Sequence, residues 1–259
     1  MTRTLRDRAA RHPLGAFITV ALPAGWLLLS LPIVLDLPRE PFVLATLLLA
    51  LVLPAVALTA LDGGRGAVRA LLRDAVRLPR PLSWGPVAAL ALPVVVWLAA
   101  APLGAAVPPT PSVLVGFAVG LVTGAIIINI WEEVVWTGFV QRRAMARWGS
   151  TRGSVATAVL FAGIHAPLAF DGARTGTDVL VGLAVLLGTG LGLRLLIAHL
   201  DTWSGGSLLT VGILHASFNA TAGLVEPGHD WVRLAVTVVL GVVVTLATIA
   251  HRRARTLAP

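Results

Sequence analysis

The chain of 259 residues contains no cysteine and no lysine, and charged residues make up only 12% of it. The absence of cysteine excludes a disulfide framework, a cysteine-based zinc site and a cysteine nucleophile. The scarcity of charge, with 57% hydrophobic residues and a mean hydropathy of +0.88, excludes an ordinary water-soluble domain. No ionisable side chain occurs from Pro81 to Trp131, a stretch that exceeds two membrane crossings of about 20 residues each. The sequence therefore predicts an integral membrane protein.

Apolar segments recur along the chain and predict an all-α fold, a polytopic membrane bundle of about eight transmembrane helices. They lie at 14–35, 41–61, 84–104, 112–140, 154–170, 179–198, 206–224 and 232–250. The first segment follows a run of arginines but is longer than the core of a signal peptide, so we expect it to be retained. Neither an internal repeat nor a linker divides the sequence, and we expect a single membrane domain over 1–259.

Positive charge is concentrated between these segments. All 20 basic residues are arginines, and the formal net charge is +8. If the N-terminus is cytoplasmic, nearly all arginines fall in the termini and loops of the cytoplasmic side, and only Arg39, Arg174 and Arg233 border the outside. The positive-inside rule therefore predicts a plasma or inner membrane protein with both termini in the cytoplasm.

The loop at 62–83 carries arginines at helical spacing between apolar residues. This pattern predicts a basic amphipathic helix that lies on the inner membrane surface and binds lipid. Because no basic stripe is interleaved with aromatic residues, we expect no nucleic-acid partner.

Ionisable side chains inside the predicted spans are costly in lipid and usually mark functional sites. Those in question, with one neighbouring amide, are Glu132, Glu133, His165, Arg194, His215 and Asn219. Counted at about 1.5 Å per residue from the nearest cytoplasmic charge, Glu133, His165 and His215 lie roughly 14, 20 and 21 Å deep.

Helical spacing groups these residues further. His215 and Asn219 share one helix face, as do Phe161 and His165, and Asn129 and Thr137 flank Glu133 at four residues on either side. We therefore expect one buried site, open toward the cytoplasmic half, that comprises the following residues: Glu132, Glu133, His165, His215 and Asn219. Interhelical hydrogen bonding is the alternative role for a single His or Asn, but it accounts poorly for two adjacent carboxylates.

Three motifs in this region resemble the CPBP intramembrane protease family, which includes the type II CAAX prenyl endopeptidases and bacteriocin-processing or self-immunity proteins. The family shows paired glutamates followed by x-x-x-Arg-Gly, then Phe-x-x-x-His, then His-x-x-x-Asn, each on a separate membrane helix. In this chain the motifs are Glu132-Glu133 with Thr137-Gly138, Phe161 with His165, and His215 with Asn219. The resemblance covers about 130–223 and implies a catalytic core at about 112–224.

One position departs from the family pattern, because Thr137 stands where the family has arginine. Threonine cannot supply the guanidinium that would pair with a glutamate. Arg194 is the one other cation within a span, at a depth of roughly 10 Å. It either takes the place of the missing arginine or extends to the membrane surface.

The resemblance implies an intramembrane endopeptidase that acts on a membrane-associated peptide or protein. In that family Glu132 would be the base that activates water, His165 would help to hold the water, and His215 with Asn219 would donate to the oxyanion. A poorly hydrated carboxylate is a stronger base than one in water, and two donors on one oxygen are what an oxyanion hole needs.

A divalent metal such as zinc is left open as a cofactor, with Glu132, His165 and His215 as its candidate ligands. The sequence lacks the His-Glu-x-x-His spacing of soluble zinc proteases, and glutamate-activated water needs no metal.

Two other function classes stay open at this stage. A non-catalytic family member could act as a membrane binding, regulatory or immunity protein, which the departure at Thr137 favours. A proton-coupled transporter could use the same buried groups, although the sequence shows no inverted repeat.

Overall fold

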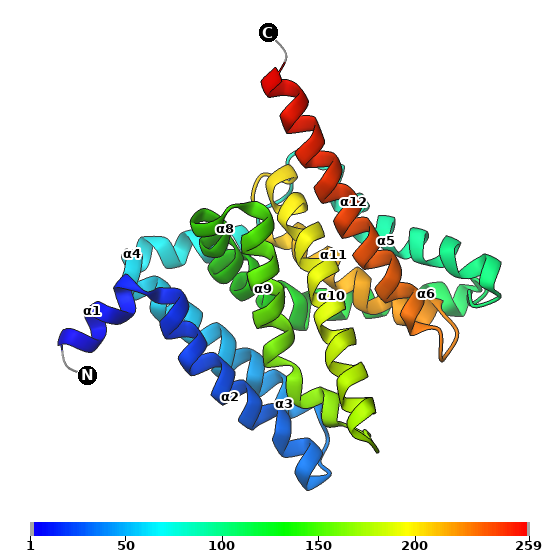
Figure 1. The fold of residues 1–259 in the computed structure, drawn as a ribbon, viewed down its shortest axis with the longest axis horizontal. Coiled ribbons are helices and arrows are strands. Elements are labelled where there is room, and N and C mark those ends of the chain that lie inside the picture. Colours follow the sequence, from blue (N-terminus) through cyan, green and yellow to red (C-terminus); the bar gives the residue numbers. More distant parts are fainter. Residues whose placement is uncertain (1–2, 258–259) are drawn as a thin grey trace.

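The computed structural model describes residues 3–257, with side chains for residues 7–255, and every regular element in this part is helical (Figure 1). The predicted all-α fold is thereby confirmed. Residues 1–2 and 258–259, which belong to the termini predicted to be cytoplasmic, lie outside the described residues. The α-helices are α1 (Arg3–Arg11), α2 (Pro13–Leu35), α3 (Glu40–Ala45), α4 (Leu53–Ala75), α5 (Trp84–Ala100), α6 (Pro111–Gly124), α7 (Ile130–Glu133), α8 (Arg142–Trp148), α9 (Ser150–Ile164), α10 (Gly176–Trp203), α11 (Leu208–Ala220) and α12 (Asp230–Leu257).

Six continuous helical stretches are long and apolar enough to cross a membrane, which confirms a polytopic membrane bundle. They are Pro13–Leu35, Glu40–Ala75, Trp84–Leu103, Pro111–Trp148, Gly176–Trp203 and Asp230–Arg255. The predicted segments 154–170 and 206–224 also form helices, α9 of 15 residues and α11 of 13, each followed by a short 3-10 turn, η5 (Ala166–Phe170) and η6 (Thr221–Leu224). The count of eight crossings stays a prediction, because these two helices are shorter than the other six.

The segment 62–83, predicted as an amphipathic helix, does not form a helix of its own in the structure. Its first part is the second half of α4, which continues from the preceding apolar helix and is kinked at Gly64, where φ is 69°. Glycine tolerates this left-handed conformation without steric cost. Beyond Ala75 the chain leaves the helix and forms a loop up to α5.

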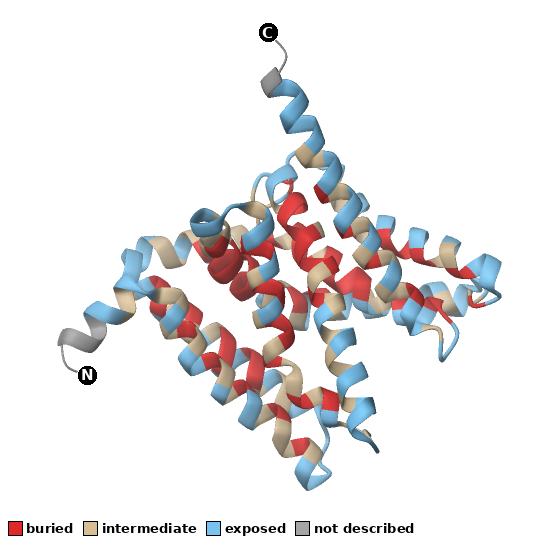
Figure 2. Ribbon diagram, viewed as in Figure 1, coloured by how far each residue is buried: buried red, intermediate tan, exposed pale blue. Residues whose placement is uncertain are grey.

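The helix core consists of two hydrophobic clusters that meet at one segment. One cluster joins α2, α4 and α9 around Phe17 and Phe139, and the other joins α5, α10 and α11 around Val96 and Leu193. The shared segment is η4 (Val134–Gln141), all of whose residues are buried; Val134 belongs to one cluster and Trp136 to the other. Figure 2 accordingly shows the buried residues concentrated at the centre of the bundle.

The stretch Pro111–Trp148 that contains this segment departs from regular α-helix on both sides of the paired glutamates. Segment η3 (Ala125–Asn129) precedes α7 and η4 follows it, and both are π-helical. Another π-helical stretch, η1 (Thr46–Val52), faces η4 from the N-terminal half. Since π-helical turns are rare and frequently occur at functional sites, this backbone agrees with the expectation of a site at Glu132-Glu133.

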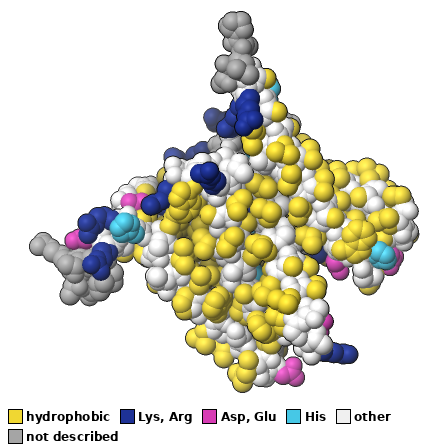
Figure 3. All heavy atoms as spheres, viewed as in Figure 1, with side chains coloured by type: hydrophobic (Ala, Val, Ile, Leu, Met, Phe, Trp, Pro, Cys, Tyr) yellow, Lys and Arg dark blue, Asp and Glu magenta, His cyan; other side chains and the backbone are white. Residues whose placement is uncertain are grey.

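The molecular surface agrees with a lipid environment. Large apolar side chains such as Leu27, Val34 and Leu180 are exposed on the spanning helices. Figure 3 shows hydrophobic side chains over most of the visible face, while dark blue arginines gather near the ends of α1, α8 and α12. The bundle thus has an apolar surface around its middle and one arginine-rich end, as expected for a protein embedded in a bilayer.

Candidate active site

Glu133 is the centre of the polar cluster, and its carboxylate is fully buried between α7, α10 and α11. Arg194 donates to it with both terminal nitrogens, Nη2 to Oε1 at 2.5 Å and Nη1 to Oε2 at 2.9 Å. His215 contacts Oε1 through Nδ1 at 2.7 Å, and the Thr137 hydroxyl donates to Oε2. Four contacts from three other elements therefore satisfy both oxygens, so this buried carboxylate is compensated in charge and in hydrogen bonds.

Arg194 lies inside the bundle with none of its side chain exposed, so of its two predicted placements the membrane surface is wrong. Its guanidinium also lies 4.8 Å from the centre of the Phe161 ring and contacts the Thr137 hydroxyl at 3.4 Å. The cation therefore reaches Glu133 from α10, while the position where the family has arginine contributes only a hydroxyl. The small threonine leaves the volume that the guanidinium fills.

Glu132 differs from its neighbour in having few contacts. Its side chain retains 12% exposure, and Asn129 Nδ2 donates to Oε2 at 3.3 Å. Asn129 was expected to share a helix face with Glu133, but its amide donates to Glu132, three residues along the chain. Oε1 of Glu132 lies 4.0 Å from Nε2 of His165, too far for a direct hydrogen bond and close enough for one water to contact both.

The orientation of His165 is fixed by its own backbone. Nδ1 lies 2.7 Å from the carbonyl oxygen of Phe161, one turn earlier in α9. Because a carbonyl can only accept, Nδ1 carries the proton, and in the neutral ring Nε2 is an acceptor that faces Glu132. The Phe161 ring packs against both histidines, with its centre 4.7 Å from that of His165 and 5.7 Å from that of His215.

His215 reaches the cluster because α11 approaches α7 closely at Gly212, where an added Cβ would lie 2.9 Å from Cα of Ile130. It is buried, and its Nδ1 is 3.8 Å from Glu132 in addition to its contact with Glu133. Asn219 was expected in the same buried site, yet its side chain is exposed, one residue before α11 ends. The cluster is thus buried at Glu133 and His215, while Glu132 and His165 are partly exposed and Asn219 lies at the surface.

Gln141 is a residue of this region that the sequence reasoning did not select. It is fully buried and donates from Nε2 to the main-chain oxygen of Arg194 at 2.9 Å and to Ser154 Oγ at 3.3 Å. The signal was present, because Gln141 continues the four-residue spacing of Glu133 and Thr137. Its contact holds α10 at the residue that supplies the cation.

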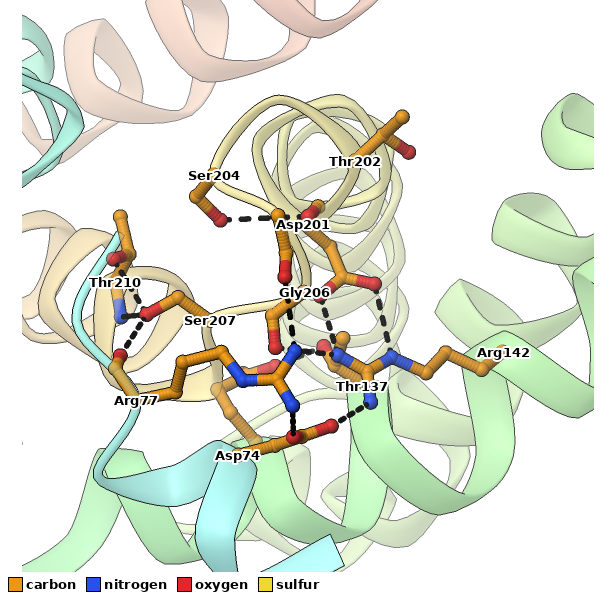
Figure 4. Close-up of polar contacts among 12 residues, drawn as sticks. Asp74, Arg77, Thr137, Arg142, Asp201, Thr202, Ser204, Gly206, Ser207 and Thr210 are labelled. Carbon is orange, nitrogen blue, oxygen red and sulfur yellow. Dashed lines mark hydrogen bonds and ion pairs between the residues drawn. The ribbon is translucent and has the colours of Figure 1, made fainter. Parts of the chain in front are cut away.

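A second polar cluster fastens the same elements at the arginine-rich end of the bundle (Figure 4). Arg142, at the start of α8, donates to both oxygens of Asp201 at 3.0 and 2.7 Å, to Asp74 at 2.8 Å and to the carbonyl of Gly206 at 2.9 Å. These contacts join α8 to α4, α10 and the turn before α11. Arg142 thus connects the helical stretches that carry Glu133, Arg194 and His215.

The donor set does not fit the three-ligand metal centre left open by the sequence. Nδ1 of His215, the nitrogen close to both glutamates, is engaged with Glu133. Among the described residues, no group of three His, Asp or Glu side chains is placed to hold a metal ion. We therefore assign no step to a metal.

Comparison with protein families identified one match. The family model described as type II CAAX prenyl endopeptidase Rce1-like matches residues 114–221, which contain all three motifs. This match confirms the predicted resemblance to the CPBP and CAAX proteases, and at the level of the family it supports a CAAX-type protease in the membrane. A comparison with curated proteins gave no match.

Proposed function

Proceeding from the similarity of its 114–221 region to the CAAX proteases, we propose that this chain is an intramembrane endopeptidase that uses a water activated by Glu132. Its substrate is a membrane-associated peptide or protein. The observation that carries the proposal is that the two glutamates have different environments. Arg194 neutralises Glu133, whereas Glu132 is partly exposed and faces Nε2 of His165 at 4.0 Å.

This difference divides the roles of the carboxylates. Glu133 accepts hydrogen bonds at both oxygens, so its lone pairs are occupied and its charge is balanced. Glu132 accepts one bond, from Asn129, and keeps lone pairs available for a proton. We therefore assign the general base to Glu132 and a positioning role to Glu133, which holds His215 and Arg194 in place.

In the proposed reaction, a water lies between Glu132 and His165. His165 accepts one hydrogen bond from the water at Nε2 and so orients it, and Glu132 takes a proton as the water oxygen attacks the carbonyl carbon. The carbonyl oxygen becomes the oxyanion of a tetrahedral intermediate. When the carbon–nitrogen bond breaks, Glu132 returns its proton to the leaving nitrogen, and the carboxylate is regenerated.

We assign oxyanion stabilisation to His215 and Asn219. Nδ1 of His215 is engaged with Glu133, which leaves Nε2 as the ring nitrogen available to a substrate oxygen. We assign Asn219, one helical turn along α11 and exposed, as the second donor.

A cleavage screen with a matched pair of variants tests the proposal. Glu132→Gln keeps the size and the contact with Asn129 but removes the base, and Glu226→Gln makes the same change at an exposed position outside the site. We expect fragments of membrane proteins that the wild type produces in detergent to disappear with Glu132→Gln and to persist with Glu226→Gln, with and without a chelator. Equal fragments from wild type and a folded Glu132→Gln protein would overturn the catalytic assignment.

The same screen decides the second candidate, a non-catalytic membrane protein that binds or regulates a partner. The observation favouring it is Thr137 in place of the family arginine. Arg194 weakens this argument, because it supplies a bidentate cation to Glu133 from another helix. Absence of any fragments dependent on Glu132, with the protein folded, would favour binding over catalysis.

We further propose one membrane domain in the inner or plasma membrane, with both termini in the cytoplasm. The lack of native cysteine makes orientation directly measurable. A cysteine introduced at exposed Gly66, in the arginine-rich half of α4, should stay unlabelled by an impermeant maleimide in intact cells. A cysteine introduced at exposed Thr177, near the start of α10, should react, because the proposed topology places this end of α10 outside. The reverse pattern would contradict the topology.

A further inference from the structure

A basic pocket lies beside the loop that joins α4 to α5, apart from the glutamate site. It encloses about 880 Å³ and none of the predicted site residues lines it. The lining comprises Arg73, Arg77, Arg80, the apolar residues Leu78 and Leu82 with two prolines, and Gly205 of the turn before α11. Its charged side chains are therefore all positive.

The three arginines are not equally engaged. Arg77 pairs with Asp74 at 2.6 Å and donates to the carbonyl of Gly205 at 3.1 Å. Asp74 also pairs with Arg142, so its single negative charge is shared between two arginines. Among the described side chains, Arg73 and Arg80 have no carboxylate within ion-pair distance, and both are exposed. The pocket thus keeps an excess of positive charge that an anion would balance.

The pocket wall is held in place before any ligand binds. The amide of Arg80 donates to the carbonyl of Ser204 at 3.0 Å, and the hydroxyl of Ser207 donates to the carbonyl of Arg77 at 2.5 Å. These bonds tie the loop to the turn between α10 and α11, as Figure 4 shows for Ser207 and Arg77. A tethered loop loses little conformational freedom when a ligand binds.

The position of the pocket identifies the source of the anion. The loop connects the membrane-spanning stretches Glu40–Ala75 and Trp84–Leu103, so it lies at a bilayer surface. Leu78 and Leu82 are 63% and 67% exposed between the arginines, and the rings of Trp84 and Trp203 stack nearby at 5.3 Å. Apolar side chains and tryptophans at this level contact acyl chains and the interface, while arginines contact phosphates.

We propose that this pocket binds the phosphate headgroup of an anionic phospholipid. Arg73 and Arg80 contact the phosphate, Arg77 supports them from its bond to Gly205, and Leu78 and Leu82 contact the acyl chains. A free phosphate ion shares the charge but gains nothing from the two leucines, which is why the lipid is the occupant. The bound lipid stabilises the end of the bundle where Arg142 clamps α4 to α10.

The test compares two double variants that remove equal charge from α4 and its following loop. Arg73→Gln/Arg80→Gln changes the pocket, and Arg65→Gln/Arg69→Gln changes exposed arginines of α4 that do not line it. Full-length protein in phosphatidylcholine nanodiscs is titrated with phosphatidylglycerol, followed by Tm and by native mass spectrometry of retained lipid. Both variants lose the same general attraction of two arginines to an anionic surface. We therefore expect the pocket variant to bind on the order of 10-fold more weakly than the control variant, because it also loses its direct charged contacts to the phosphate.

Three results would overturn the proposal. Equal losses in both variants would mean general attraction to a basic surface. A wild-type Tm that phosphatidylglycerol does not raise would mean that no such site exists. Inorganic phosphate that alone reproduces the Tm rise, with the same dependence on Arg73 and Arg80, would make the free ion the ligand. Tm in pure phosphatidylcholine, measured first, separates any folding defect from a binding defect, and no readout depends on proteolysis.

Discussion

Replacing Arg194 by leucine should destabilise the protein strongly, because it leaves the Glu133 carboxylate buried without its cation. Arg194 makes two charge-assisted bonds of 2.5 and 2.9 Å to Glu133 at zero exposure, and its guanidinium packs over Phe161. Removal of one partner of such a pair costs about 3–5 kcal/mol, since the desolvated charge remains. For a chain of this size that corresponds to a fall in Tm on the order of 10 °C.

The matched experiment returns the cation to the position where the family has it. Thr137→Arg alone adds a second cation to a filled, fully buried site and should also be destabilising. In the double variant Thr137→Arg/Arg194→Leu, the new arginine lies one turn from Glu133 and can use the volume that Arg194 vacated. We therefore expect the double variant to be more stable than either single variant, with a coupling energy of about 2 kcal/mol or more.

Thermal unfolding in detergent measures all four proteins of this cycle without requiring a substrate. Cleavage activity, if the proposed function holds, should follow the same order. The reasoning would be refuted if Arg194→Leu lowered Tm by no more than an exposed arginine substitution such as Arg65→Leu. Strict additivity of the two substitutions would equally show that positions 137 and 194 do not share one role.

Two further predictions concern the supports of this pair. Gln141→Leu should lower the free energy of unfolding by about 1–2 kcal/mol, because it removes the donor to the Arg194 carbonyl and to Ser154. Gln141→Glu should lower it further, because it places a carboxylate against that carbonyl. Equal Tm values for wild type and Gln141→Glu would contradict this prediction. Gly192→Ala should lower Tm, because its Cβ would lie 2.7 Å from the backbone of α12, whereas Gly116→Ala, with no atom within 4 Å, should not. A smaller fall for Gly192→Ala than for Gly116→Ala would show that the close approach of α10 and α12 is not required.

Much of the helical architecture could be predicted from the sequence, because lipid leaves few alternatives. Uncharged stretches of sufficient length must satisfy their backbone polar groups internally, and the helix does so within one segment. The predicted boundaries 14–35 and the observed α2 (Pro13–Leu35) differ by a single residue at the start. The shortness of α9 and α11 could not be predicted in this way, since apolar composition continues through the 3-10 turns that end them.

The sequence by itself determined which residues form the cluster's motifs, because spacing along one helix sets which side chains share a face. It could not determine how Glu133 is neutralised. Arg194 is 61 positions away on α10, and helical periodicity relates only residues of the same element. Packing of α10 against η4, with Gln141 bonded to the Arg194 carbonyl, brought the guanidinium to the carboxylate. Tertiary structure also distinguished the two adjacent glutamates. Glu133 lies in the low dielectric between two apolar clusters and has to be paired with a cation, whereas Glu132 stays partly exposed.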